Sequence, residues 1–285
     1  MNACDELKIT VVGPGVMGEA MIAGMLRKNV TTPQCILASG PELDRNEELR
    51  ERYGISVTSD NAAAVQQADV VILSIKPQLL QRVLKGLRNK IPAHALVLSI
   101  VAGASIQTIS EGLNHPHIVR SMPNTPGQIG EGITVWTHSS SVTPQQAEQA
   151  RRILGALGLE VFVEEENYLD MATALSGTGP AYVYLFMEAM IDAGVHLGFS
   201  RKISEQLVIQ TILGSVAYYK SKGVHVAKLR NEVTSPGGTT AEALYYLEKA
   251  GFRTAMSRAI WAAYERSKEL GQGLNGHMPE AKTGG

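Results

Sequence analysis

The sequence predicts an α/β protein built from two dissimilar parts. From residue 7 to about residue 165, short apolar runs rich in β-branched residues alternate with helical segments, which is typical of a parallel sheet covered by helices on both faces. A glycine-rich turn directly follows the first of these runs. After about Glu166 the apolar runs stop and only helical periodicity remains. We therefore expect a sheet domain over residues 1–165, an all-helical domain over 166–273 and a disordered tail over 274–285.

Eight apolar runs predict the strands of the first domain, and most of them end at glycine, proline or a hydroxyl residue. Ligands of such sheets bind beyond the carboxyl ends of the strands. This places a set of residues at the expected binding edge: Ser39, Ser74, Ile75, Lys76, Pro77, Val101, Ala102 and Gly103. The strands themselves are predicted at Leu7–Val12, Cys35–Ala38, Ile55–Thr58, Val70–Ile75, Ala95–Val101, His117–Met122, Ile133–Thr137 and Leu159–Val163.

The glycine-rich turn has the pattern G-x-G-x-x-G, which is common by chance but here lies between a strand and a helix, as dinucleotide binding requires. The first glycine allows the turn, the second lets the backbone approach a pyrophosphate, and the third lets the helix pack on the strand. The pattern therefore predicts a Rossmann-type domain. Its residues are Gly13, Pro14, Gly15, Val16, Met17 and Gly18.

The end of the second strand bears on which nicotinamide cofactor is used. NAD-selective sites usually carry Asp or Glu there to bind the ribose 2′-hydroxyl, and this chain has Ser39 instead. Arg45 follows nearby and is either a partner for a 2′-phosphate or a solvated helix residue. We expect NADPH as the cofactor, with NADH also possible.

Composition excludes several classes of protein. The 26 basic and 27 acidic residues are nearly balanced, which gives no electrostatic footprint for nucleic acid, and no cluster of Lys or Arg suggests a membrane surface. Two cysteines, Cys4 and Cys35, do not make a disulfide framework, and a reducing compartment is the default expectation. The start of the chain lacks the apolar segment of a signal peptide. We expect a cytoplasmic protein that binds neither nucleic acid nor membrane.

One helix of the second half predicts self-association. The segment Pro180–Leu197 is apolar on nearly every face, and such a helix must be buried. The helical half is too small to bury it on all sides, so we expect an intertwined homodimer through this half, the alternative being an internal core helix.

Two loops rich in glycine and hydroxyl residues lead into helices of the second half, at Ser176–Pro180 and at Thr234–Thr240. A helix N-terminus offers free backbone N–H groups to a small anion such as a carboxylate. The second loop also fits an ordinary capping box, with Thr239 as cap and Glu242 three residues later. No catalytic triad, activated cysteine or carboxylate pair stands out by spacing.

Taken together, these motifs resemble the pyrroline-5-carboxylate reductase family. The resemblance runs from Ile9 to about Leu270 and is strongest over Val233–Leu244. It is also carried by Leu175–Tyr182, by Ser74–Pro77 and by the segment Met122-Pro123-Asn124-Thr125-Pro126.

The resemblance implies a Rossmann domain followed by a helical dimerisation domain, and often a ring of dimers. It implies NAD(P)H-dependent reduction of 1-pyrroline-5-carboxylate to L-proline, the last step of proline biosynthesis. By motif position, Thr240 would hydrogen-bond the imine nitrogen and act as the catalytic residue. Ser235 and the backbone N–H groups of Gly238, Thr239 and Thr240 would hold the substrate carboxylate, and Asn61 would contact the adenosine side of the cofactor. No metal is implied.

Three other functions compete with this one. A reductase of another cyclic imine is the nearest alternative. A β-hydroxyacid-dehydrogenase-like enzyme shares the two-domain layout, but such enzymes use a lysine in the long helix after the sheet, and Pro180–Leu197 contains none. A non-catalytic NADP-sensing protein would have no need for the two hydroxyl-rich loops.

Overall fold

The structure, a computed structural model, describes residues 7–274 and divides into two compact units. One unit contains the described chain up to Thr178 together with the chain from Ala263 on, and the other spans Gly179–Ala262. The predicted boundary lies earlier, at residue 166. The compact unit extends beyond that boundary because helix α7 and the end of helix α12 are held to the sheet by long-range hydrogen bonds. The predicted tail lies outside the described residues, except that Leu274 is the last residue of α12.

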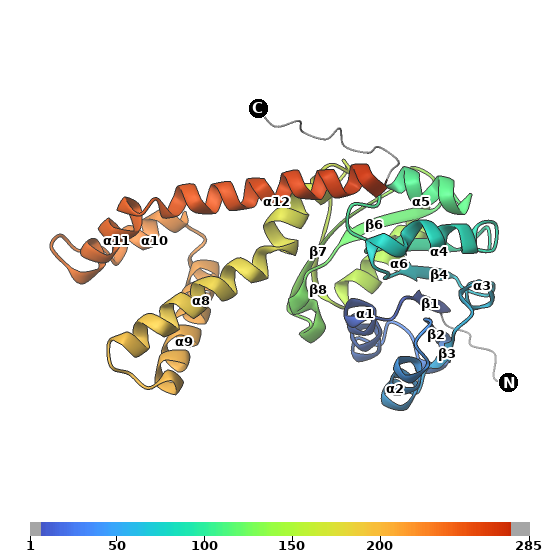
Figure 1. The fold of residues 1–285 in the computed structure, drawn as a ribbon, viewed down its shortest axis with the longest axis horizontal. Coiled ribbons are helices and arrows are strands. Elements are labelled where there is room, and N and C mark those ends of the chain that lie inside the picture. Colours follow the sequence, from blue (N-terminus) through green and yellow to red (C-terminus); the bar gives the residue numbers. More distant parts are fainter. Residues whose placement is uncertain (1–6, 275–285) are drawn as a thin grey trace. The chain divides into compact units, whose positions relative to one another are not determined.

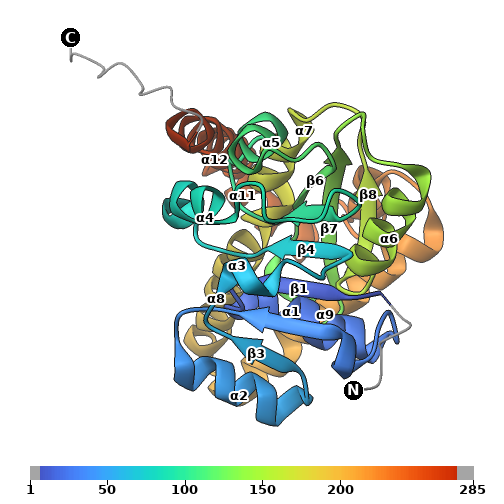
Figure 2. The same ribbon diagram turned by 90° about the vertical axis from the view of Figure 1, so that its right-hand side faces the viewer.

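The first unit is built around an eight-stranded sheet in the order β3-β2-β1-β4-β5-β6-β7-β8 (Figure 1; Figure 2). All eight strands were predicted within two residues of their observed ends. The strands are β1 Ile9–Val12, β2 Ile36–Ser39, β3 Ser56–Thr58, β4 Val70–Leu73, β5 Leu96–Ser99, β6 Ile118–Met122, β7 Gly132–His138 and β8 Gly158–Phe162.

Two strands depart from the predicted parallel sheet: β7 runs antiparallel to β6, and β8 is parallel to β7, so both run opposite to the other strands. The chain joins β6 to β7 through a short 3₁₀ turn, η3, at Thr125–Ile129. A parallel pairing needs a crossover of about a dozen residues or more, usually a helix, so this short connection reverses the strand direction.

Alternate residues of the strands point to two separate hydrophobic cores. Ile9 and Val11 face the core that holds helices α1, α2 and α6, whereas Val12 faces the core that holds α3, α4 and α5. Both faces of the sheet are therefore covered, as the near-continuous apolar strands predicted. The helices are α1 Val16–Arg27, α2 Leu43–Tyr53, α3 Asn61–Ala64, α4 Leu80–Leu87, α5 Ile106–Leu113 and α6 Pro144–Gly155, with 3₁₀ turns η1 Pro33–Cys35 and η2 Pro77–Leu79.

After β8, helix α7 (Tyr168–Ala172) continues directly into a π-helical turn, η4, at Thr173–Gly177. Cys35 at the end of η1 is disulfide-bonded, which corrects the expectation of a chain without a disulfide. The Cys35 side chain also accepts a hydrogen bond from the Thr32 hydroxyl at 3.4 Å.

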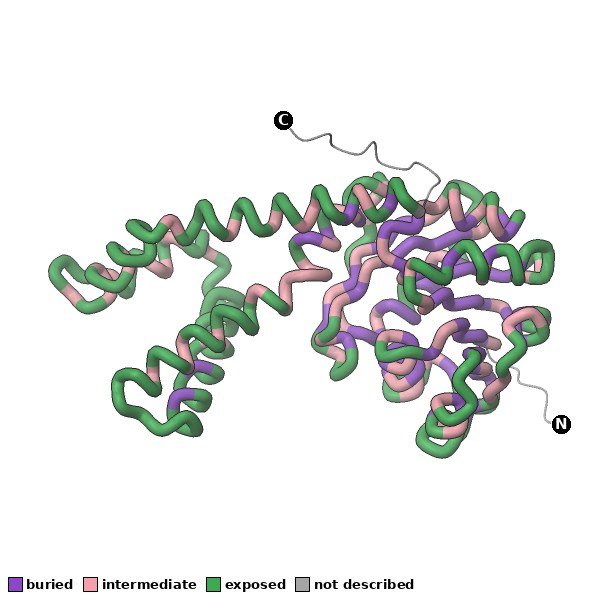
Figure 3. The backbone as a smooth tube through the Cα atoms, in the orientation of Figure 1, coloured by how far each residue is buried: buried purple, intermediate pink, exposed green. Residues whose placement is uncertain are grey.

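The second unit is helical, as predicted, and leaves its apolar side chains largely uncovered (Figure 3). None of the residues of α8 is buried, and Leu185 is 68 % exposed. Gly194 on α8 lets α9 approach, because a Cβ there would lie 2.7 Å from the Ser204 hydroxyl. This unit therefore has almost no core of its own. Its helices are α8 Gly179–His196, α9 Arg201–Lys222, α10 Val226–Glu232, α11 Thr239–Lys249 and the first part of α12 Phe252–Leu274.

Candidate functional site

The glycine-rich turn has the geometry that each of its three glycines predicts. Gly13 has φ +81°, and a side chain there would run into Ile75, so only glycine fits. Gly15 is the N-cap of α1, and a Cβ at this position would have no neighbour within 4 Å. A Cβ on Gly18 would lie 3.0 Å from the Ser74 hydroxyl, so the third glycine brings the helix close to the end of β4. The open space belongs to the glycine that should face a pyrophosphate.

This turn lies at the point where the strand order reverses. Strands β1 and β4 are neighbours, although β2 and β3 separate them in sequence, and such switch points open a crevice beyond the carboxyl ends of the strands. The Ser74 N–H donates to the Val12 carbonyl at 2.9 Å, so the chain after β4 continues alongside the glycine-rich turn. Lys76 is exposed and Pro77 begins η2. The structure thus brings Gly13–Gly18 and Ser74–Pro77 together.

The end of β2 forms the adjoining wall of the crevice. The buried Ser39 hydroxyl lies 2.5 Å from the Asn61 side-chain carbonyl, to which it donates, and the Gly13 N–H donates to the Ser39 carbonyl at 2.8 Å. Asn61 is the first residue of α3, which Asp60 caps through two backbone N–H groups. These hydrogen bonds place Ser39 and Asn61 together on the side where the adenosine ribose of a dinucleotide lies.

Asn46 is a residue of this wall that the sequence analysis missed. Its amide donates to the carbonyls of Gly40 and Thr58 at 2.9 and 3.1 Å, which ties the ends of β2 and β3 together. The side chain is 3 % exposed. An asparagine within a charged helix carries no pattern that distinguishes it, so only the structure reveals this role.

Arg45, the candidate partner of a 2′-phosphate, already has protein partners. It forms ion pairs with Glu19 on α1 and, at 2.7 Å, with Glu48, and it donates to the Pro14 carbonyl at 3.4 Å. Burial raises the pKa of Glu19, but hydrogen bonds from Arg45, Tyr53 and Arg52 outweigh it and hold that pKa below its ordinary value. Arg45 is therefore a solvated helix residue only in part, because it also touches the glycine-rich turn.

The segment after β5 lies at the same edge, but the end of helix α12 covers part of it. Gly103 is buried with φ +75°, and a Cβ there would lie 3.0 Å from the Gly271 backbone nitrogen. Ala102 is half-buried. The glycine therefore serves the packing of α12 on the sheet, and Ala102 is the less buried residue of this segment.

The first hydroxyl-rich loop is not a loop, and this corrects the prediction of a free helix N-terminus there. Ser176 and Gly177 belong to the π-helical turn η4, and the Thr178 N–H and hydroxyl both donate to the Thr173 carbonyl, at 2.8 and 2.9 Å. Asn124 holds this turn, because its amide donates to the Ser176 carbonyl at 3.1 Å. Isolated π-turns are frequent at functional sites.

The second hydroxyl-rich loop does end at a helix N-terminus, but it is built differently from the capping box we predicted. The Gly238 N–H donates to the Ser235 carbonyl at 3.0 Å, with Pro236 and Gly237 (φ +70°) between them, which matches a type II turn. Gly238 is the N-cap of α11 and no side chain caps the helix, so Thr239 is its first residue and not its cap.

The N–H array of α11 therefore begins one residue later than predicted. Because the Gly238 N–H is engaged within the turn, it is not available for a carboxylate. The N–H groups of Thr239, Thr240 and Ala241 belong to the first turn, which has no intrahelical acceptor for them. Thr240 is half-buried, and Ser235 is exposed.

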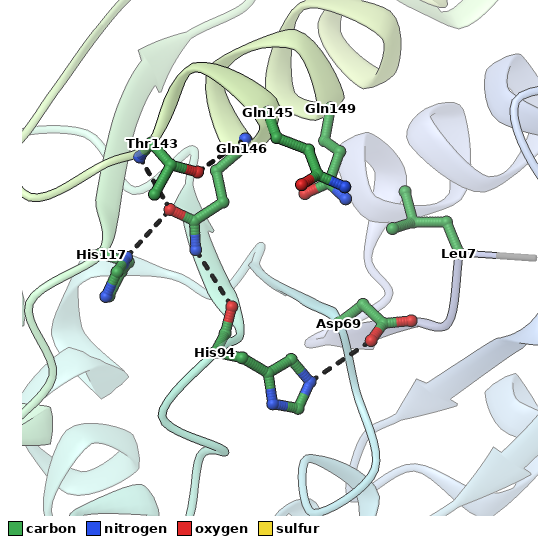
Figure 4. A pocket seen from close by; sticks show the side chains of 8 residues that line it. All are labelled: Leu7, Asp69, His94, His117, Thr143, Gln145, Gln146 and Gln149. Atoms are coloured by element: carbon green, nitrogen blue, oxygen red, sulfur yellow. Dashed lines mark hydrogen bonds and ion pairs between the residues drawn. The ribbon is translucent and has the colours of Figure 1, made fainter.

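A separate polar pocket lies at the amino ends of the strands, away from the switch point (Figure 4). It has a volume of about 490 Å³. Its polar groups are largely paired: Gln146 accepts from the Thr143 N–H at 2.9 Å and donates to the His94 carbonyl at 3.0 Å, and His94 lies 3.3 Å from Asp69. The residues that line it are Leu7, Asp69, His94, His117, Thr143, Gln145, Gln146 and Gln149.

Two histidines lie at or beside this pocket: His117 lines it, and His115 precedes His117 by two residues. His117 Nδ1 lies 2.9 Å from the Gln146 side-chain carbonyl, and the His115 Nε2 lies 2.7 Å from the Ala95 carbonyl, so each of these nitrogens must carry a proton. Burial lowers the pKa of both rings. Within the described part of the chain, no group of three or more His, Cys, Asp or Glu side chains forms a metal site.

Comparisons with known proteins find relatives of both parts of the chain. Residues 166–270 match the family model described as pyrroline-5-carboxylate reductase dimerisation, and residues 8–103 match the one described as NADP oxidoreductase coenzyme F420-dependent. A pyrroline-5-carboxylate reductase of Synechocystis is 41 % identical over 94 % of this chain and 99 % of its own.

Solved structures of similar sequence share the whole fold. The pyrroline carboxylate reductase of Plasmodium falciparum with NADP bound is 34 % identical, with a TM-score of 0.86 over 94 % of this chain and 100 % of that one. A pyrroline-5-carboxylate reductase from Coxiella burnetii is 34 % identical, with a TM-score of 0.85 over 93 % and 99 % of the two chains.

Proposed function

The chain belongs to the pyrroline-5-carboxylate reductase family, and from that premise we propose how its residues reduce 1-pyrroline-5-carboxylate to L-proline with NAD(P)H, the last step of proline biosynthesis. One observation carries the assignment of the substrate site. The type II turn at Ser235–Gly238 leads into α11 and leaves the N–H groups of Thr239, Thr240 and Ala241 at its open end. A substrate carboxylate is the anion that such an end accepts.

The residues of the switch point fit a dinucleotide. The N-terminus of α1 and the open space beside Gly15 suit a pyrophosphate, and Ser39 with Asn61 suits the adenosine ribose. Lys76, Pro77 and Ala102 line the remaining edge. When bound, the nicotinamide supplies a hydride to the carbon of the substrate C=N bond. We propose NADPH over NADH, because β2 ends in Ser39 at the position where NAD-selective sites usually carry Asp or Glu.

The protein groups then have three tasks, none of which needs a nucleophile. The first-turn N–H groups of α11 and the Ser235 hydroxyl hold the substrate carboxylate. The Thr240 hydroxyl donates a hydrogen bond to the imine nitrogen, or positions a water that protonates it. Orientation of the ring against the hydride donor supplies most of the acceleration, since a reaction between two bound molecules gains chiefly from correct placement.

The helical unit forms a homodimer, in agreement with the dimerisation family match and with the uncovered apolar side chains of α8. We propose that dimers assemble further into rings, which mass photometry at nanomolar to micromolar concentration can test: a dimer-only distribution would exclude them. Among the described residues, no helix is long and apolar enough to cross a membrane. We propose a cytoplasmic location.

The decisive experiment follows NADPH oxidation at 340 nm on addition of 1-pyrroline-5-carboxylate, with L-proline identified by chiral chromatography. The alternative, reduction of another cyclic imine, is tested in the same assay with the six-membered imine carboxylate. A higher kcat/KM for that ring would overturn the proposed substrate, and a lack of NADPH oxidation with both rings would overturn the proposed reaction.

A further inference from the structure

The guanidinium of Arg45 lies where the glycine-rich turn meets the end of β2. It contacts the Pro14 carbonyl at 3.4 Å, and a Cβ on Gly40 would lie 3.0 Å from the Pro14 ring. Asn46, the residue after Arg45, is tied to the Gly40 carbonyl at 2.9 Å. The 2′ position of an adenosine ribose bound to a Rossmann-type domain lies at this end of β2, and an arginine nearby accommodates a 2′-phosphate. Arg45 is therefore placed to meet that phosphate.

The positive charge of Arg45 is nevertheless balanced by carboxylates of the protein itself. Four side chains form one network, in which Arg45 and Arg52 share the carboxylates of Glu19 and Glu48. Glu19 also accepts from the Tyr53 hydroxyl at 2.8 Å. Two positive and two negative charges cancel. A 2′-phosphate carries about two negative charges near neutral pH. Arg45 should attract this phosphate, but the carboxylate of Glu19 beside Arg45 repels it.

The network is arranged so that Arg45 can leave it without stranding a charge. If Arg45 turns to a phosphate, Glu19 keeps its bonds to Arg52, at 2.6 Å, and to Tyr53. Glu48 keeps its bond to Arg52 at 2.7 Å. No carboxylate is left without a partner. Breaking a charged network is costly when it leaves a charged group unpaired, and that cost does not arise here. The exchange of Arg45 from carboxylate to phosphate therefore leaves no carboxylate of the network unpaired.

We propose that Glu19 sets the degree of discrimination between NADPH and NADH, by competing with the 2′-phosphate for Arg45. This inference rests on the proposed use of a nicotinamide cofactor and adds to it a specificity-determining residue that does not touch the cofactor. In this arrangement Arg45 provides the attraction for the phosphate, and Glu19 limits it, so that NADH remains usable.

The test measures binding of cofactor fragments and needs no imine substrate. Isothermal titration calorimetry gives the dissociation constants of adenosine 2′,5′-bisphosphate and of adenosine 5′-monophosphate, whose ratio reports the 2′-phosphate alone. We expect Glu19→Gln to raise the preference for the bisphosphate by about threefold to fivefold, the size of one partly exposed charge. Arg45→Met should lower it by about tenfold or more, since a charge-assisted contact is lost.

Two further variants make the result specific. Arg50→Gln is the matched control, because Arg50 lies on the same helix and, among the described residues, forms an ion pair with Glu47 alone, so the ratio should not change. Glu48→Gln removes a carboxylate from the network without touching α1 and should raise the preference in the same direction as Glu19→Gln. Thermal melts confirm that each variant folds.

An unchanged ratio in Glu19→Gln would overturn the proposal, as would an unchanged ratio in Arg45→Met. The kcat/KM ratio for NADPH over NADH should follow the same order. If the fragments behave as expected while 1-pyrroline-5-carboxylate is not reduced, the proposed substrate fails and the role of Glu19 stands.

Discussion

Arg120 on β6 is the cation of a buried network, and replacing it should destabilise the first unit strongly. Its guanidinium lies 2.9 Å from Glu166 and 3.2 Å from Asp170, and its side chain is 7 % exposed. Ser267 of α12 donates to the same Asp170 oxygen at 2.9 Å, and the Ile106 N–H at the start of α5 donates to Glu166 at 2.8 Å. One arginine thus links β6, α7, α5 and α12.

In Arg120→Met two carboxylates lose their cation in a site with little water. Breaking a buried pair from one side costs about 3–5 kcal/mol. We place this case near about 3 kcal/mol, because the Glu166 side chain is 33 % exposed and can recruit water. For a chain of this size, this corresponds to a fall of about 6–12 °C in the melting temperature.

The assay is urea unfolding followed by circular dichroism at constant protein concentration, with thermal melts as a second measure. Arg151→Gln is the control: Arg151 also pairs with two carboxylates, at 3.5 and 3.4 Å, but its side chain is 55 % exposed, so the expected loss is below about 1 kcal/mol. A loss for Arg120→Met no larger than that of the control would refute the reasoning from burial.

Three further predictions separate cofactor binding, catalysis and pH dependence. Gly15→Ala should leave the melting temperature unchanged, because a Cβ there meets open space. The same variant should weaken NADPH binding by about tenfold or more, because the methyl group blocks the pyrophosphate. A fall in both the melting temperature and the NADPH affinity would mean that the glycine serves the fold. Thr240→Ala should lose more than about tenfold in kcat/KM, on the order of 1.4 kcal/mol, whereas Thr240→Ser should keep most of it; near-normal kinetics in the alanine variant would remove the hydroxyl from the mechanism. The fold holds the pKa of His115 and His117 below the ordinary value, so the unfolded chain binds protons that the folded chain does not. The contribution of these two histidines to the free energy of unfolding is therefore fully present above about pH 6.5. It falls as the pH drops toward the folded pKa values, by at most about 1.4 kcal/mol per pH unit for each ring. Denaturant midpoints from pH 8 to 5 measure this, and the double variant with Gln at both positions should flatten the curve.

The sequence was sufficient for the features that local pattern encodes. The strands of the first unit, the roles of the three glycines and the uncovered apolar helix α8 all follow from residue type and spacing within one segment. Features that depend on contacts between distant segments could not be predicted. The π-turn at Thr173–Gly177 depends on Asn124, and the packing of α12 on the sheet depends on Gly103 and Asp170.

The loop before α11 contains one feature that the sequence predicts and one that it does not. Ser235-Pro236-Gly237-Gly238 has the composition of a type II turn, with proline second and a glycine of positive φ third, so its shape was open to prediction from the sequence. The capping box assigned to Thr239 and Glu242 competed with that turn, and the turn prevailed because it makes Gly238 the N-cap. One hydrogen bond, from the Gly238 N–H to the Ser235 carbonyl, decides between the two.

That shift by one residue has a chemical consequence for selectivity. With the Gly238 N–H engaged, a carboxylate is left with Thr239, Thr240 and Ala241, and the Thr240 hydroxyl belongs to the same helical turn. In 1-pyrroline-5-carboxylate the carboxylate is attached to the carbon bonded to nitrogen, so both of its polar groups lie within reach of a single turn. A six-membered ring with the same substitution presents the same pair of groups. We therefore propose that the start of α11 selects substrates by the relation between carboxylate and imine nitrogen, and that discrimination by ring size comes from apolar surfaces that meet the remaining carbons.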